Sequence, residues 1–180
     1  MPFFILFVTD ILLGFVPQAT GCAVCLFAVA NQKLASRSFL YTSLIYSAIA
    51  VVVRVAYNYG LIDFGFHTII IWMIFIVVAL AYNRLPPVKA TVSILISGVI
   101  ITVSELITCV ILMAAIGQNE FNAIMNNTLT TEGKIDKAIC GIPANLLFFI
   151  LVLVLYRVLM VRRQKRIDAK ENNEAEEADA

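Results

Sequence analysis

Charge is what this sequence has least of. Asp, Glu, Lys and Arg make up 14% of the 180 residues, whereas apolar residues make up 61%. An ordinary soluble domain carries about 25% charged and about 45–50% apolar residues. A soluble fold of this length could not bury so much apolar surface. The composition therefore excludes a soluble globular protein and predicts a single integral membrane domain.

Residues that catalysis and metal binding require are also scarce. His67 is the only histidine, so neither a metal-ligand cluster nor a Ser/His/Asp set can be assembled with suitable spacing. Paired aspartates and an HExxH motif, which an intramembrane protease would need, are absent as well. No basic, aromatic-rich stretch suggests nucleic acid. We therefore expect no enzyme activity, no cofactor, no metal site and no nucleic-acid partner.

The four cysteines form no recognisable disulfide framework. Cys22 and Cys25 make a CxxC inside an apolar run, with no histidine or charge nearby to activate a thiol, which favours a role as small packing residues. Cys109 and Cys140 could lie near the same membrane face. A disulfide between these two is left open.

Five apolar runs have about the length that crosses a bilayer, which takes about 20 residues. The predicted spans cover about residues 3–30, 39–57, 65–82, 88–116 and 142–161. Between the last two, a polar segment carries apolar residues at the spacing of a short amphipathic helix lying at the interface, namely Phe121, Ile124, Met125 and Leu129. We expect an all-α fold in which residues 1–166 form a bundle of five transmembrane helices with a short interfacial helical loop. Residues 167–180 are expected to form an acidic, disordered tail.

Basic residues near the span ends predict the orientation. Alternating spans place nine Lys and Arg residues on one side of the membrane, namely Lys33, Arg37, Arg84, Lys89, Arg162, Arg163, Lys165, Arg166 and Lys170. The loops on the other side carry Lys134 and Lys137. The N-terminus is therefore expected outside the cell and the C-terminus in the cytoplasm.

Small and polar residues at helical spacing predict which faces meet other helices. In the first span, Pro17 is expected to kink the helix, and it shares one face with other residues, namely Asp10, Gly14, Gly21 and Cys25. In the fourth span the corresponding stripe is Ser93, Ser97, Ser104 and Thr108.

Four ionisable residues fall inside the predicted spans, where a charge costs roughly 2.5–3.5 kcal/mol at mid-bilayer. At ~1.5 Å per residue, Arg54 and His67 lie a few ångströms below the outer surface, Asp10 deeper and Glu105 deepest. Arg54 could snorkel to the headgroups, His67 could bond a loop carbonyl, and Asp10 could reach water. Glu105 has no such route, so it is either protonated or paired with a cation. We predict that Arg54 reaches Glu105, and that these four residues form a polar pocket open to the outside.

Several short motifs resemble one bacterial family. They are Arg54, the FGFHT run at 64–68, the LPPVKA run at 85–90, Glu105 and the GIP run at 141–143. Over about residues 5–160 the chain is similar to the membrane-embedded input (sensor) region of Gram-positive bacterial sensor histidine kinases and its stand-alone relatives. The resemblance implies a five-helix sensory bundle in a bacterial plasma membrane, whose last helix leads into a cytoplasmic kinase. After Arg166, however, no phosphoacceptor histidine or ATP-binding segment follows, so this chain is expected to lack kinase activity.

The sequence leaves three candidate functions. The first is a sensory, signalling or accessory membrane protein that acts through a cytoplasmic kinase or regulator, with the lipid bilayer and a homodimer as further expected partners. The alternative is the substrate-binding membrane component of a small-molecule transporter. The absence of an inverted repeat and of a polar path through the inner half weighs against transport. A purely structural helper of a larger complex is a third reading.

Overall fold

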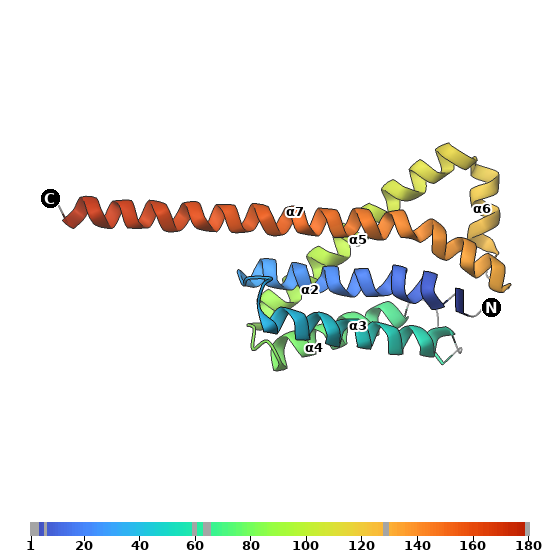
Figure 1. The fold of residues 1–180 in the computed structure, drawn as a ribbon, viewed down its shortest axis with the longest axis horizontal. Helices are drawn as coiled ribbons and strands as arrows, with labels where there is room; N and C mark the ends of the chain where they lie inside the picture. The colour runs from blue at the N-terminus through green and yellow to red at the C-terminus, as the bar shows by residue number, and fades with distance from the viewer. Residues whose placement is uncertain (1–3, 6, 59–60, 63–65, 128–129, 179–180) are drawn as a thin grey trace.

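The computed structural model describes residues 4–5, 7–58, 61–62, 66–127 and 130–178. These residues are almost entirely helical, and no strand occurs among them, which confirms the all-α prediction. In chain order they form the π-helix η1 (Phe7–Phe15) and the α-helices α2 (Val16–Ala30), α3 (Arg37–Asn58), α4 (Phe66–Ala81), α5 (Pro87–Ile116), α6 (Gln118–Asn126) and α7 (Thr131–Ala178). Figure 1 shows their arrangement.

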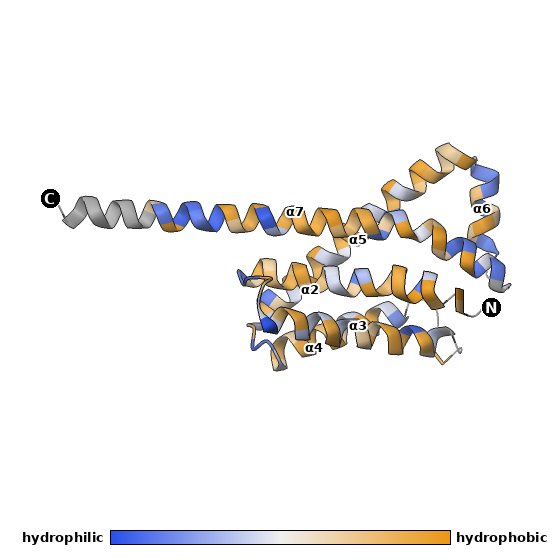
Figure 2. Ribbon diagram, in the orientation of Figure 1, coloured by the Kyte–Doolittle hydropathy of each residue, from blue (hydrophilic) through white to orange (hydrophobic). Residues whose placement is uncertain are grey.

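Four described helices are long and apolar enough to cross a membrane, namely Phe7–Ala30, Arg37–Tyr57, Pro87–Ile116 and Glu132–Ala169. The remaining predicted span, 65–82, corresponds to α4, which is apolar but has only 16 residues. At 1.5 Å per residue α4 is about 24 Å long, shorter than the ~30 Å hydrocarbon core. Hydrophilic residues gather at α6, at the start of α7 and towards the C-terminus, and apolar residues cover most of the remainder (Figure 2). A membrane-spanning helical protein is thus supported, and the count of five spans stays a prediction.

The bundle is built around α2. This helix packs against η1, α3, α5 and α7, and its side chains from residue 21 to residue 28 are all buried. The sequence predicted contacts along one face only. The structure differs because α2 carries small or apolar side chains on every side, and a helix with that pattern is buried all round.

The expected kink at Pro17 takes the form of a change in helix type. Residues 7–15 are π-helical, and α2 begins at Val16 with Pro17 in its first turn. Proline has no N–H and its ring clashes with the carbonyl four residues earlier, so an α-helix cannot continue unchanged through it. A wider π-helical turn before the proline accommodates that clash, and such segments are frequent at functional sites.

Two glycines permit close contact between helices. A Cβ on Gly21 of α2 would clash with the Phe148 ring of α7, and a Cβ on Gly98 of α5 would lie 2.5 Å from Cη2 of Trp72 on α4. Each ring therefore occupies the place that a side chain would need. These contacts determine how closely α7 approaches α2 and how closely α4 approaches α5.

The predicted stripe on α5 is confirmed, because Ser93, Ser97, Ser104 and Thr108 are all buried. The serine hydroxyls donate hydrogen bonds to carbonyls one turn back, such as Ser93 to Ala90 at 2.7 Å, so no polar group is left open at these contacts. The CxxC residues are buried as packing residues, and the Cys25 thiol donates to the Ser93 carbonyl at 3.3 Å. All four cysteines are free thiols, so Cys109 and Cys140 do not pair.

The short helix predicted between the last two spans is present as α6, and its position at the membrane interface stays a prediction. Phe121 is buried, and Ile124 and Met125 are half-buried, whereas Leu129 lies outside the described residues.

The last helix, α7, is longer at both ends than the predicted span 142–161. It begins at Thr131, where Thr130 Oγ1 accepts a hydrogen bond from the Gly133 N–H at 3.1 Å and caps the helix. Pro143 lies inside α7, whose first turns are inclined to the rest (Figure 1). The helix continues to Ala178, where a disordered tail was predicted. No Gly or Pro follows Pro143, and Ala, Glu, Lys and Arg all favour helix.

The connections divide between two ends of the bundle. The start of η1, the end of α3, the start of α4 and α6 lie at one end, which we call the α6 end (Figure 1). The α2–α3 and α4–α5 connections lie at the opposite end, and α7 extends well beyond it. This is the grouping of loops that alternating spans require.

Candidate functional site

Asp10 of η1 and Arg54 of α3 meet inside the α6 end of the bundle. Arg54 Nε donates to Asp10 Oδ2 and Arg54 Nη2 donates to Asp10 Oδ1, both at 2.9 Å. The pair is bidentate, the strongest geometry for a guanidinium and a carboxylate. The two side chains are only 20% and 12% exposed, so they neutralise each other away from solvent.

Aromatic rings enclose this ion pair. The Arg54 guanidinium carbon lies 4.5 Å from the centre of the Phe15 ring and 4.8 Å from that of Tyr57. Both distances are within the range of cation–π contacts. The Tyr57 ring in turn lies 4.7 Å from the imidazole of His67 on α4. The ion pair therefore joins η1 and α3, and ring contacts extend it to α4.

The predicted Arg54–Glu105 pair is wrong. Arg54 directs the Nε–Nη2 edge of its guanidinium at Asp10 and is not among the residues that line the cavity next to Glu105. Depth along the helices explains only in part why Arg54 pairs with Asp10 and not with Glu105. Asp10 lies nearer to the depth of Arg54 than Glu105 does, and η1 also packs directly against α3, whereas Glu105 belongs to α5. Asp63, beside these residues in sequence, lies outside the described residues.

A cavity of about 300 Å³ lies between α2, α4 and α5. Its lining combines aromatic and aliphatic side chains with a few polar ones, the usual composition of a small-molecule site. The polar lining residues are Gln18, Cys22, His67, Thr68, Thr102 and Glu105, and the aromatic ones are Phe15, Trp72 and Phe75. The cavity includes the first turns of α4 and therefore lies toward the α6 end.

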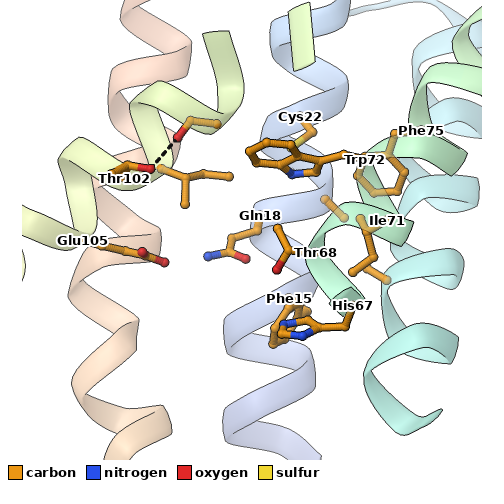
Figure 3. Close-up of a pocket in the computed structure, with 14 residues that line it drawn as sticks. Phe15, Gln18, Cys22, His67, Thr68, Ile71, Trp72, Phe75, Thr102 and Glu105 are labelled. Carbon is orange, nitrogen blue, oxygen red and sulfur yellow. Dashed lines mark hydrogen bonds between the residues drawn. The ribbon is translucent and has the colours of Figure 1, made fainter. Parts of the chain in front are cut away.

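Three polar side chains converge on the cavity from three helices. Glu105 of α5 extends toward Gln18 of α2, with Thr68 of α4 beyond it (Figure 3). Across the part of the chain that the structure describes, no hydrogen bond or ion pair reaches the Glu105 carboxylate or the Gln18 amide. Glu105 is exposed and Gln18 is half-buried, so both side chains can bind a molecule that enters the cavity.

Local helix geometry explains why these side chains share the cavity. Gln18 and Cys22 are four residues apart on α2, as are Thr68 and Trp72 on α4, so each pair lies on one helix face. On α5, Glu105 follows Ile101 by four residues and Thr102 by three. The Thr102 hydroxyl donates to the Gly98 carbonyl at 3.0 Å, which fixes its rotamer beside the cavity (Figure 3).

The four predicted site residues thus divide into two adjacent groups. Asp10 and Arg54 form the ion pair, whereas His67 and Glu105 line the cavity. His67 connects the groups, because its side chain is 8% exposed and contacts both the Tyr57 ring and the cavity. Sequence reasoning missed Gln18 and Trp72. An amide within the first apolar run and the only tryptophan of the chain were the signals that could have identified them.

Within the described ranges, no three His, Cys, Asp or Glu side chains lie close enough to hold a metal ion. Comparison with known proteins found no matching family model, no matching curated protein and no matching solved structure.

Proposed function

We propose that the protein is a sensory or accessory component of a bacterial plasma membrane, with its cavity toward the exterior and its C-terminus in the cytoplasm. Ligand in the cavity changes the packing of α7, and α7 carries the change to a cytoplasmic kinase or regulator. The observation that carries this proposal is the course of α7. One uninterrupted helix runs from the α6 end, past the cavity helices, to Ala178 beyond the bundle (Figure 1).

The helices that line the cavity also hold α7. Both α2 and α5 contribute lining residues, and both pack against α7. Gly21, where the Phe148 ring of α7 packs, is next in sequence to the cavity residue Cys22. A ligand that separates α2 from α5 must therefore displace the surface on which α7 lies.

At the opposite end of the bundle, two hydrogen bonds connect α7 to the α2–α3 connection. Arg163 Nη1 donates to the Asn31 carbonyl at 2.5 Å, and the Leu34 N–H donates to Tyr156 Oη at 3.3 Å. Just beyond them, the basic residues Arg162, Lys165 and Arg166 are exposed. This segment offers a docking site for an acidic surface of a cytoplasmic partner, and its position depends on the register of α7. A ligand can shift that position only by binding two arrangements of the bundle with different affinity.

The transport alternative is less well supported. The cavity ends at Phe75, whose ring stacks on Tyr46 at 3.8 Å while the Tyr46 hydroxyl donates to the Phe75 carbonyl at 2.8 Å. Tyr46 is fully buried, and the core beyond it is formed by apolar residues such as Leu26 and Phe27. Accumulation of a solute by liposomes containing the purified protein would overturn the sensory proposal.

Spin labels test the transmission step. Tyr41 on α3 and Ile167 on α7 are exposed and can be replaced by labelled cysteines, with Cys109 and Cys140 changed to serine. Double electron–electron resonance spectroscopy then measures the distance distribution between the labels in bilayers. We expect Glu105→Gln to shift the distribution, because it alters the cavity, and Glu120→Gln on exposed α6 to leave it unchanged. Identical distributions in the wild type and in Glu105→Gln would overturn the proposal.

A further inference from the structure

We propose that the cavity binds a small organic monocation, an alkylammonium group, with the Glu105 carboxylate as its counter-ion and the Trp72 indole as its aromatic wall. The assignment of this cation as the sensed ligand rests on the proposed function, whereas binding itself does not. The inference follows from the charge, the wall and the polar groups of the cavity.

The lining carries one unbalanced acidic group. The charges of Asp10 and Arg54 cancel each other, and both residues lie outside the lining. Among Asp, Glu, Lys, Arg and His, the lining contains Glu105 and His67. No cation of the described chain pairs with Glu105. Glu105 is exposed at the cavity, and a carboxylate with no cation beside it attracts a ligand that supplies one positive charge. An anion would be repelled by the same group.

The wall opposite suits an organic cation better than a hydrated inorganic one. Trp72, Phe75 and Phe15 all line the cavity, and the faces of aromatic rings attract ammonium groups while excluding water. The Gln18 side-chain carbonyl and the Thr68 hydroxyl, which extend into the same space (Figure 3), can accept hydrogen bonds from an ammonium N–H. One charge, several acceptors and an apolar wall together match a primary ammonium on a short alkyl chain.

The size of the cavity agrees. At about 30 Å³ per water molecule, 300 Å³ holds on the order of ten waters, and a short alkylammonium ion occupies part of that space. The Trp72 ring lies over Gly98, so the absence of a side chain at Gly98 allows the ring its place in the cavity wall.

The chain carries its own reporter of occupancy, because Trp72 is its only tryptophan. Purified full-length protein in nanodiscs is titrated with butylammonium, butanol and butyrate, which share one chain length and differ in charge. The titration is run at pH 8, above the usual imidazole pKa of about 6.5. We expect saturable quenching or shift of the Trp72 emission by butylammonium, with much weaker binding of butanol and none of butyrate.

Two variants separate charge from shape. Glu105→Gln is expected to weaken butylammonium binding by about 10- to 100-fold, the usual effect of losing a charged hydrogen-bond partner, while leaving butanol binding unchanged. Gly98→Ala displaces the indole and weakens both cation and alcohol. Glu120→Gln, outside the cavity, is the matched control. Equal affinity for butanol and butylammonium, or Glu105→Gln binding the cation as the wild type does, would overturn the proposal.

The two proposals fail differently. If butylammonium does not bind but Glu105→Gln still shifts the labels on α7, the ligand class is wrong and the sensory function stands. If butylammonium binds with the expected dependence on Glu105 but α7 does not move, the site is correctly assigned and the sensory function fails.

Discussion

Two charged residues, Asp10 and Arg54, supply much of the polar cohesion of the α6 end. Their bidentate contact is flanked by Phe15 and Tyr57, whose rings lie over the Arg54 guanidinium. Removing one partner leaves the other as an uncompensated charge in a low-dielectric site, which costs more than the contact itself is worth. The contact between these two residues therefore determines how stably η1 packs against α3.

We expect Arg54→Gln to lower the stability of the detergent-solubilised protein by about 2–4 kcal/mol, because Asp10 loses its counter-charge. Asp10→Asn is expected to cost a similar amount. The double variant should cost clearly less than the sum of the two, since the charges disappear together. Thermal loss of the monodisperse species measures the effect, and Arg157→Gln, which changes an exposed arginine of α7, serves as the control. Additive effects of the two single changes would show that the pair is not coupled.

At the scale of helices, close approach at glycine connects α2 to α7. The Phe148 ring is fully buried against α2, at the place where a larger residue at position 21 would project. In a membrane, where lipid tails are as apolar as the helices, packing of this kind is a main source of association between helices. The α2–α7 contact is therefore the element on which transmission through α7 depends.

Gly21→Ala is expected to destabilise the protein by about 1–3 kcal/mol, because the added methyl overlaps a buried ring. Gly141→Ala in α7 is the matched change, since its Cβ would meet nothing within 4 Å. This second variant should be neutral or should gain up to about 1 kcal/mol from improved helix propensity. Thermal unfolding of the two variants side by side measures both, and equal behaviour would contradict the assigned contact.

Some features of the helices could be predicted from the sequence, and others could not. The buried serines of α5 follow from their four-residue spacing, and α6 follows from Phe121, Ile124 and Met125 at helical positions. The partner of Arg54 does not follow, because depth along a helix carries no information on which helix lies beside it. The start of α7 was missed because the residues before 142 are polar and were assigned to the connection, whereas the helix already begins at Thr131.

Considered as a whole molecule, the bundle is asymmetric. Its α6 end holds the ion pair and the cavity, whereas its opposite end is closed by apolar packing and by hydrogen bonds between α7 and the α2–α3 connection. The ion pair and the cavity therefore lie near one end of the bundle only. The side of the membrane that the cavity faces depends on which end lies in the cytoplasm, and the distribution of basic residues predicts that the opposite end does.

Labelling of intact cells tests this orientation. In a background with Cys109 and Cys140 changed to serine, a membrane-impermeant maleimide should label Asn122→Cys on exposed α6 without permeabilisation. Ile167→Cys should react only after the membrane is opened. The buried thiols of Cys22 and Cys25 should stay unreacted in both cases. The reverse pattern would place the cavity toward the cytoplasm and would contradict the proposed direction of sensing.

The contrast between a neutralised ion pair and a solitary carboxylate has an electrical consequence. Asp10 and Arg54 together carry no net charge, so the voltage across a living membrane exerts little force on them. Glu105, deeper in the bundle, does feel that voltage, and so does any cation that reaches it. A full crossing of 100 mV is worth about 2.3 kcal/mol per charge. If the cavity faces the exterior, as proposed, an energised cell, negative inside, draws the cation inward and fills the cavity at lower external concentrations than a depolarised one.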